Sequence, residues 1–183
     1  MIFLAYYKDE IKSELIKFKQ DENHAVTRWL TMIAKLDIAS LPKVDYIVRA
    51  LGSKEIKVKS SPIDKIGIIL SNKLKAPYIP QILEKKETRQ LKFLNRQERM
   101  IAIKNSYKCV GGVPLDKHAS ILVIDDVITT GATGNEISKV LKETYGSGIN
   151  IYYFALVQTP LSTDYGNDAQ QYNHKFYKQL MQA

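Results

Sequence analysis

The sequence is poor in cysteine and in long apolar runs. Its single cysteine, Cys109, has no partner for an internal disulfide and no companions for a cysteine-bound zinc site. No apolar run exceeds seven residues, whereas a membrane-spanning helix needs about 20. The apolar start before Lys8 also lacks the basic segment that opens a signal peptide. We therefore expect a cytoplasmic protein without a membrane partner.

Clustered metal ligands and repeats are also missing. The histidines are scattered without ligand spacing and receive no functional role: His24, His118 and His174. No segment recurs at a fixed spacing, which excludes a repeat architecture. The composition, with 45% hydrophobic and 25% charged residues among 183, is that of one globular domain. The expected division of this domain (1–183) is N-terminal helices or a hood (1–40), an α/β core (41–160) and a polar C-terminal tail (161–183).

Positive charge is concentrated in one part of the chain. The net charge is +8, and residues 84–108 carry eight basic and three acidic side chains, or +5 of that excess. Such a segment attracts polyanions. Nucleic acid, a membrane surface and a phosphorylated metabolite all remain open as partners on charge alone.

The pattern of apolar residues alternates between helical and strand spacing after the first 40 residues. The expected elements are helices within 7–19 and 25–34, a strand at 44–48, a helix at 61–74, a strand at 78–83, an exposed loop at 84–94, a helix at 95–104, a strand at 121–124, a helix at 131–145 and a strand at 149–157. This order predicts an α/β fold, a doubly wound parallel sheet whose ligand site lies outside the carboxyl ends of the strands. For 169–181, a docked helix and a disordered end both stay open.

The most specific segment is 121–133, Ile-Leu-Val-Ile-Asp-Asp-Val-Ile-Thr-Thr-Gly-Ala-Thr. A buried strand here ends in Asp125 and Asp126, whose carboxylates accept hydrogen bonds and therefore suit the hydroxyls of a sugar. The hydroxyl-rich turn that follows presents backbone N–H groups at the start of a helix, which favours a phosphate monoester. Its expected phosphate ligands are Thr129, Thr130, Gly131, Ala132 and Thr133. The plainer alternative is a strand end followed by a helix cap.

This string resembles the phosphoribosyl-pyrophosphate (PRPP) signature of type I phosphoribosyltransferases. Within that superfamily the chain is most similar to ComF-like (competence protein F-like) proteins, although it lacks the zinc ribbon with which they usually begin. The stretch 7–19 resembles their opening helix, and Leu94 and Arg99 match a Leu-x-x-x-x-Arg element. The resemblance implies a doubly wound sheet of the phosphoribosyltransferase kind, with a small hood.

Two further segments gain a role from the resemblance. The loop after the 44–48 strand lies where type I enzymes hold pyrophosphate, and its expected ligands are Arg49, Leu51, Gly52, Ser53 and Lys54. An ordinary turn with solvated cations is the alternative. The loop 84–94 lies where the superfamily has a mobile cover, and Arg89 is our choice there for a catalytic contact beside Asp125 and Asp126.

The leading hypothesis is magnesium-dependent transfer of ribose 5-phosphate from PRPP to a nitrogen nucleophile such as a nucleobase. The resemblance implies that Mg²⁺ is held mainly through PRPP, with Asp125 or Asp126 as the protein ligand left open. The second hypothesis is a PRPP- or nucleic-acid-associated protein in DNA uptake or regulation, with little turnover. Nucleic acid is the less favoured partner, and a homodimer stays open.

Overall fold

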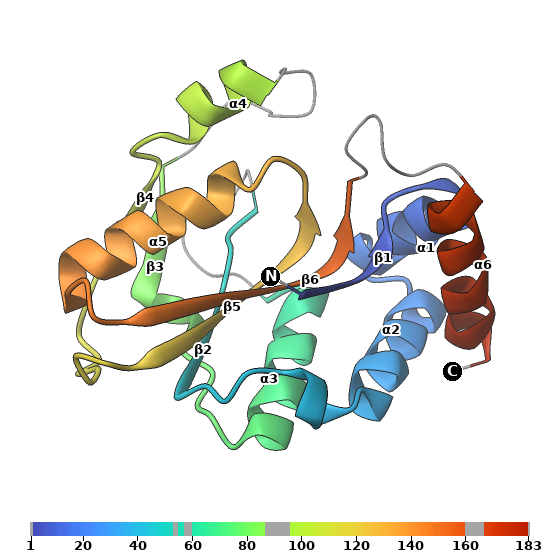
Figure 1. The fold of residues 1–183 in the computed structure, drawn as a ribbon, viewed down its shortest axis with the longest axis horizontal. Coiled ribbons are helices and arrows are strands. Elements are labelled where there is room, and N and C mark those ends of the chain that lie inside the picture. Colours follow the sequence, from blue (N-terminus) through green and yellow to red (C-terminus); the bar gives the residue numbers. More distant parts are fainter. Residues whose placement is uncertain (1, 53–54, 57–59, 87–95, 160–166, 183) are drawn as a thin grey trace.

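The chain forms a parallel sheet covered by helices on both faces (Figure 1). The computed structural model describes residues 2–52, 55–56, 60–86, 96–159 and 167–182. Its helices and strands are β1 (Ile2–Tyr6), α1 (Asp9–Lys19), α2 (Asn23–Lys35), β2 (Tyr46–Arg49), α3 (Pro62–Leu74), β3 (Leu83–Lys85), α4 (Arg96–Ile103), β4 (Tyr107–Cys109), β5 (Ser120–Ile128), α5 (Ala132–Tyr145), β6 (Asn150–Gln158) and α6 (Asn167–Met181), with 3-10 turns at Ile38–Ser40 and Pro80–Ile82.

The main sheet has the order β1-β6-β5-β2, and each neighbouring pair is parallel. Residues 121–124 of β5 are fully buried because alternate side chains enter two cores. Leu122 and Ile124 pack with α1, α2, α3 and α6, whereas Ile121 and Val123 pack with α5. A central strand buried on both faces reads as a continuous apolar run. The predicted α/β class with a parallel sheet is therefore confirmed.

The N-terminus adds a strand that the sequence pattern did not predict. Ile2 pairs with Phe154 and Tyr6 with Gln158, so β1 extends the sheet beside β6. Its partner lies about 150 residues away in sequence, and a five-residue apolar run has no periodicity that separates strand from helix. The chain then continues into the two expected N-terminal helices, α1 and α2.

The predicted strand at 78–83 is wrong. Tyr78 forms only an isolated bridge with Ile47, and Pro80 then begins a 3-10 turn. Proline lacks the N–H group that a central strand needs. The strand that follows, β3, pairs antiparallel with β4 in a separate two-stranded sheet.

The C-terminal tail contains a docked helix, which decides between the two alternatives left open for 169–181. Phe176 and Leu180 of α6 are buried, and the Phe176 ring lies 5.8 Å from that of Trp29 in α2. The Asn173 side chain fixes the helix to β1, because it accepts the Tyr6 N–H at 2.9 Å and donates to the Tyr6 carbonyl at 3.0 Å. Across the described ranges, no helix is long and apolar enough to cross a membrane.

Candidate functional site

A cleft of about 880 Å³ lies beyond the carboxyl ends of β2 and β5. Its lining comes from α1, from the loop after β2, from the start of α3 and from the end of β5. The lining residues used below are Tyr7, Phe18, Lys19, Arg49, Leu51, Gly52, Glu55, Lys85, Asp125, Asp126, Thr129 and Thr133. The cleft therefore lies at the edge of the sheet where a doubly wound fold binds its ligand.

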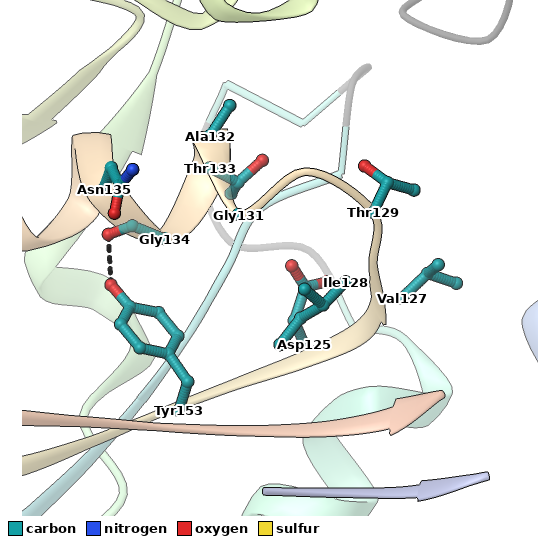
Figure 2. Close-up of a pocket in the computed structure, with 10 residues that line it drawn as sticks. All are labelled: Asp125, Val127, Ile128, Thr129, Gly131, Ala132, Thr133, Gly134, Asn135 and Tyr153. Carbon is teal, nitrogen blue, oxygen red and sulfur yellow. Dashed lines mark hydrogen bonds between the residues drawn. The ribbon is translucent and has the colours of Figure 1, made fainter. Parts of the chain in front are cut away.

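The turn after β5 encloses a smaller pocket of about 120 Å³ at the start of α5. Gly131 caps this helix with φ +76°, a left-handed conformation that favours glycine. The first N–H groups of a helix have no acceptor within the helix, so those at the start of α5 suit an anion. Figure 2 shows Asp125 inside the bend of this turn, with Thr129 and Thr133 beside it.

The predicted phosphate ligands do not all face the pocket. Thr129, Gly131, Ala132 and Thr133 line it, as expected. Thr130 is not among its lining residues, and its hydroxyl accepts a long contact of 3.4 Å from the Ala132 N–H. Thr130 therefore belongs to the turn itself, and its direct contact with phosphate remains a prediction.

Tyr153 of β6 holds the start of α5 from below. Its hydroxyl donates to the Gly134 carbonyl (Figure 2). The same hydroxyl lies 3.0 Å from the Ser138 hydroxyl. A Cβ at Gly134 would come within 3.1 Å of the Tyr153 ring, so a side chain there would displace the ring by a few tenths of an ångström. The tyrosine thus fixes the first turn of the helix against the sheet, and nothing in the sequence motif indicated it.

The two predicted carboxylates lie together at the end of β5. The Asp126 N–H donates to Asp125 Oδ1 at 2.8 Å, and Asp126 Oδ2 lies 2.6 Å from Lys19 Nζ in α1. Burial, followed by the charge of Asp126, raises the pKa of Asp125 to about 7. Burial acts to lower the pKa of Lys19, but the charge and hydrogen bond of Asp126 outweigh it and raise this pKa.

The raised pKa of Asp125 makes stability depend on pH. Because the folded pKa of about 7 exceeds the ordinary value of 3.8, the folded state binds the extra proton between these values. The stability of the wild type should therefore fall, relative to Asp125→Asn, as pH rises from about 4 to about 7, and level off above. Thermal melts of both proteins between pH 5 and 8.5 measure this difference. Asp126→Asn should weaken the dependence on pH, because the charge of Asp126 is one of the causes that raise the pKa of Asp125. A flat difference between the wild type and Asp125→Asn across this range would contradict the assignment.

The loop after β2 differs from its prediction. Leu51 and Gly52 are predicted pyrophosphate ligands, but the Leu51 N–H donates to the Tyr107 hydroxyl at 3.0 Å. That hydroxyl in turn donates to the Leu51 carbonyl at 2.8 Å. The Gly52 N–H donates to the Glu55 carboxylate at 2.7 Å. Both groups therefore have partners within the protein, and the other two predicted ligands of this loop, Ser53 and Lys54, lie outside the described residues.

Lys85 supplies a buried cation beside this loop. Its ammonium donates to the Leu51 carbonyl at 3.2 Å and lies 5.0 Å from the centre of the Tyr107 ring. Burial lowers the pKa of Lys85, while the charge of Asp125 acts in the opposite direction. Lys85 lies in the cleft wall, so a phosphate group that enters the cleft meets a positive charge there.

Arg49, which is a predicted pyrophosphate ligand, instead pairs with two carboxylates of the protein. Its side chain is only 1% exposed, and its guanidinium donates to Glu55 at 2.9 and 2.8 Å and to Asp64 at 2.7 Å. Asp64 is held in turn by the capping box of α3 and by the Tyr78 hydroxyl at 2.5 Å. In this arrangement Arg49 positions the loop and the start of α3, and its contact with pyrophosphate remains a prediction.

Removal of the Arg49 charge should destabilise the protein strongly. Arg49→Met would leave Glu55 and Asp64 close together without their shared cation, at an expected cost of about 3 kcal/mol. The matched variant Lys65→Met breaks an exposed pair with Asp21 and should cost less than about 1 kcal/mol. Urea unfolding of both variants measures the two losses. Equal losses in the free energy of unfolding would show that the buried ion pairs of Arg49 stabilise the protein no more than the exposed pair does.

The side chains that line the cleft decide whether it could hold a magnesium ion. Among the described residues, no group of three or more His, Cys, Asp or Glu side chains is placed to hold a metal ion. The cleft does present the oxygen ligands of Asp125 and Asp126, and Mg²⁺ is often held by one or two carboxylates together with substrate phosphates. These residues fit a magnesium ion that is carried mainly by its ligand, and the ion itself remains a prediction.

Several contacts of the site were not predicted. Lys19, Glu55 and Tyr107 come from three different elements and meet the predicted residues only in the folded chain. The sequence contained one signal for Glu55, because this acidic residue follows a loop that was expected to bind anions. The predicted catalytic contact Arg89 lies outside the described residues.

The fold and the cleft define a doubly wound α/β protein with its candidate site beyond the strand ends. No family model matches the sequence. The chain is 23% identical over 164 residues to competence protein F of Haemophilus influenzae, a match that covers 85% of this chain and 72% of that protein. The resemblance to ComF-like proteins that the sequence motifs indicated is thereby confirmed.

Solved structures also match this chain. Adenine phosphoribosyltransferase from Leishmania donovani is 12% identical, with a TM-score of 0.46, over 84% of this chain and 76% of that one. The allosteric regulatory enzyme of purine biosynthesis is 19% identical, with a TM-score of 0.42, over 71% of this chain. The match spans only 25% of that longer enzyme.

Proposed function

We propose that the cleft binds PRPP with magnesium and transfers its ribose 5-phosphate group to a nitrogen nucleophile. The observation that carries this proposal is the continuity of two subsites. Asp125, Thr129 and Thr133 line both the small pocket at the start of α5 and the large cleft. A phosphate in the pocket and the sugar attached to it in the cleft would therefore be bound side by side.

The phosphate monoester would bind at the start of α5. The N–H groups of the first helical turn, which have no acceptor within the helix, and the positive end of the helix dipole favour an anion there. The left-handed Gly131 shapes the turn, and Tyr153 fixes the helix behind it. The resulting pocket of about 120 Å³ has room for a phosphate group.

The ribose would lie over Asp125 and Asp126. Ionised carboxylates accept hydrogen bonds from vicinal hydroxyls, and their negative charge stabilises the positive charge that develops on the ring. In the transfer, the bond from C1 to the pyrophosphate oxygen breaks and its electron pair leaves with pyrophosphate. A bond from the nucleophile's nitrogen to C1 forms, and the nitrogen's proton is released.

The leaving pyrophosphate would face Lys85 and the loop after β2. Lys85 provides a fixed positive charge on this wall of the cleft. A magnesium ion held by the ligand's phosphates and by Asp125 or Asp126 would neutralise further charge on the leaving group. The nucleophile would enter from the α1 side, where Tyr7 and Phe18 line the cleft.

A second candidate function is a ComF-like role in DNA uptake or regulation, with PRPP or nucleic acid bound and little turnover. The similarity to competence protein F favours it, as does the +5 charge of residues 84–108. Affinity for DNA should then fall steeply with ionic strength, because contacts to many phosphates release counterions. Binding to a metabolite in a pocket should respond much less.

Release of pyrophosphate separates the two candidates. The protein is incubated with PRPP, magnesium and each nucleobase in turn, and pyrophosphate is detected with a coupled enzyme assay. Release that depends on one base and is lost in Asp125→Asn/Asp126→Asn supports the transferase. Release with no base above the protein-free rate, together with salt-sensitive DNA binding, supports the second candidate.

A further inference from the structure

Three N–H donors converge on the carboxylate of Glu55 in the wall of the cleft. Two come from the Arg49 guanidinium, at 2.9 and 2.8 Å, and one from the Gly52 backbone, at 2.7 Å. A forked guanidinium together with a backbone amide is also the donor set that binds phosphate oxygens. Glu55 therefore occupies a group of donors suited to an anionic ligand.

The position of Glu55 differs from that of a purely structural ion pair. Its side chain is 18% exposed, whereas that of Arg49 is 1% exposed, although both residues line the cleft. A Cβ at Gly52 would lie 3.2 Å from the Glu55 carboxylate, so a side chain there would push the carboxylate away by a few tenths of an ångström. The carboxylate is thus the more exposed partner of the buried Arg49 guanidinium.

Arg49 keeps a second partner if Glu55 leaves. Asp64 accepts from the Arg49 guanidinium at 2.7 Å on its other side. Asp64 is itself fixed by the Ser61 N–H at 2.9 Å and by the Tyr78 hydroxyl at 2.5 Å. The Ala50 carbonyl also accepts from the Arg49 guanidinium, at 3.2 Å. Displacement of Glu55 would therefore leave Arg49 with these acceptors and with the two N–H groups that now donate to Glu55.

We propose that Glu55 is a built-in anion that competes with phosphorylated ligands for the Arg49 and Gly52 donors. A ligand that takes its place exchanges one anion for another, so the buried guanidinium stays neutralised. The competition lowers affinity for a group at this subsite and leaves the phosphate pocket at α5 unaffected. That the arriving group is the pyrophosphate of PRPP rests on the proposed function, whereas the competition itself does not.

Inorganic pyrophosphate and ribose 5-phosphate are the two probes, each titrated by calorimetry. Glu55→Ala should bind pyrophosphate about tenfold more tightly than the wild type, with ribose 5-phosphate changed by less than about twofold. Glu55→Asp, whose shorter side chain reaches the donors less well, should show a smaller gain. Glu143→Gln removes one negative charge from an exposed position on α5 and should change neither affinity.

Circular dichroism establishes that each variant is folded, and Glu55→Gln replaces the alanine variant if that protein unfolds. Unchanged or weaker pyrophosphate binding in the folded variants would overturn the competition. Equal gains for both probes would also overturn it, because a general change in charge would explain them. A gain for pyrophosphate without any PRPP binding would support the subsite and count against the proposed function alone.

Discussion

Gly131→Val should weaken phosphate binding about 100-fold while leaving the protein folded. The left-handed φ of +76° at this position strains a β-branched residue by about 1 to 2 kcal/mol. A Cβ here has no protein atom within 4 Å, so the valine methyl groups would extend into the space beside the pocket. Loss of two charge-assisted hydrogen bonds to phosphate would weaken binding by about 100-fold.

A second glycine with a positive φ provides the control. Gly146 ends α5 with φ +100° and ψ 158°, a conformation that is essentially restricted to glycine, and a Cβ there also has no atom within 4 Å. Gly146→Val should therefore cost at least as much stability as Gly131→Val yet keep its affinity for inorganic phosphate, as measured by calorimetry. Equal loss of binding in both variants would assign the effect to helix stability and would remove the phosphate role from Gly131.

Asp125→Asn/Asp126→Asn should lose recognition of ribose and keep recognition of phosphate. The amide side chains keep the shape of the strand end, and the turn at 129–133 is untouched. We expect affinity for ribose 5-phosphate to fall at least about tenfold, with inorganic phosphate changed by less than about threefold. Calorimetry with the two ligands measures both values.

The matched control removes two carboxylates elsewhere. Glu10 and Glu143 are exposed and do not line the cleft, so Glu10→Gln/Glu143→Gln makes the same change in net charge. Its affinities for both ligands should stay close to those of the wild type. If the double Asn variant instead loses affinity for both ligands equally, the carboxylates do not bind the sugar.

The sequence predicted those parts of the molecule that depend on local pattern. The four-residue apolar run 121–124 indicated a strand buried on both faces, and the structure places its alternate residues in two cores. The hydroxyl-rich turn indicated backbone N–H groups at the start of a helix, and α5 begins at Ala132, directly after Gly131. Both signals are contained in a few adjacent residues.

The remaining features depend on contacts between distant segments. The strand β1 exists because Ile2 meets Phe154, and no pattern within five residues encodes that pairing. The Leu51 N–H is occupied because Tyr107, 56 residues away, reaches it. The resemblance predicted a pyrophosphate-binding loop at this place, and only the folded chain shows that protein groups contact its Leu51 and Gly52 N–H groups.

Thermal melting with PRPP is the most direct test of the proposed cleft. A ligand that binds only the native state stabilises it by mass action, so millimolar PRPP with magnesium should raise the Tm by roughly 5 °C or more if it exceeds its Kd about 100-fold. Magnesium alone should have a smaller effect. An unchanged Tm with millimolar PRPP and magnesium would contradict the assignment of this cleft to PRPP.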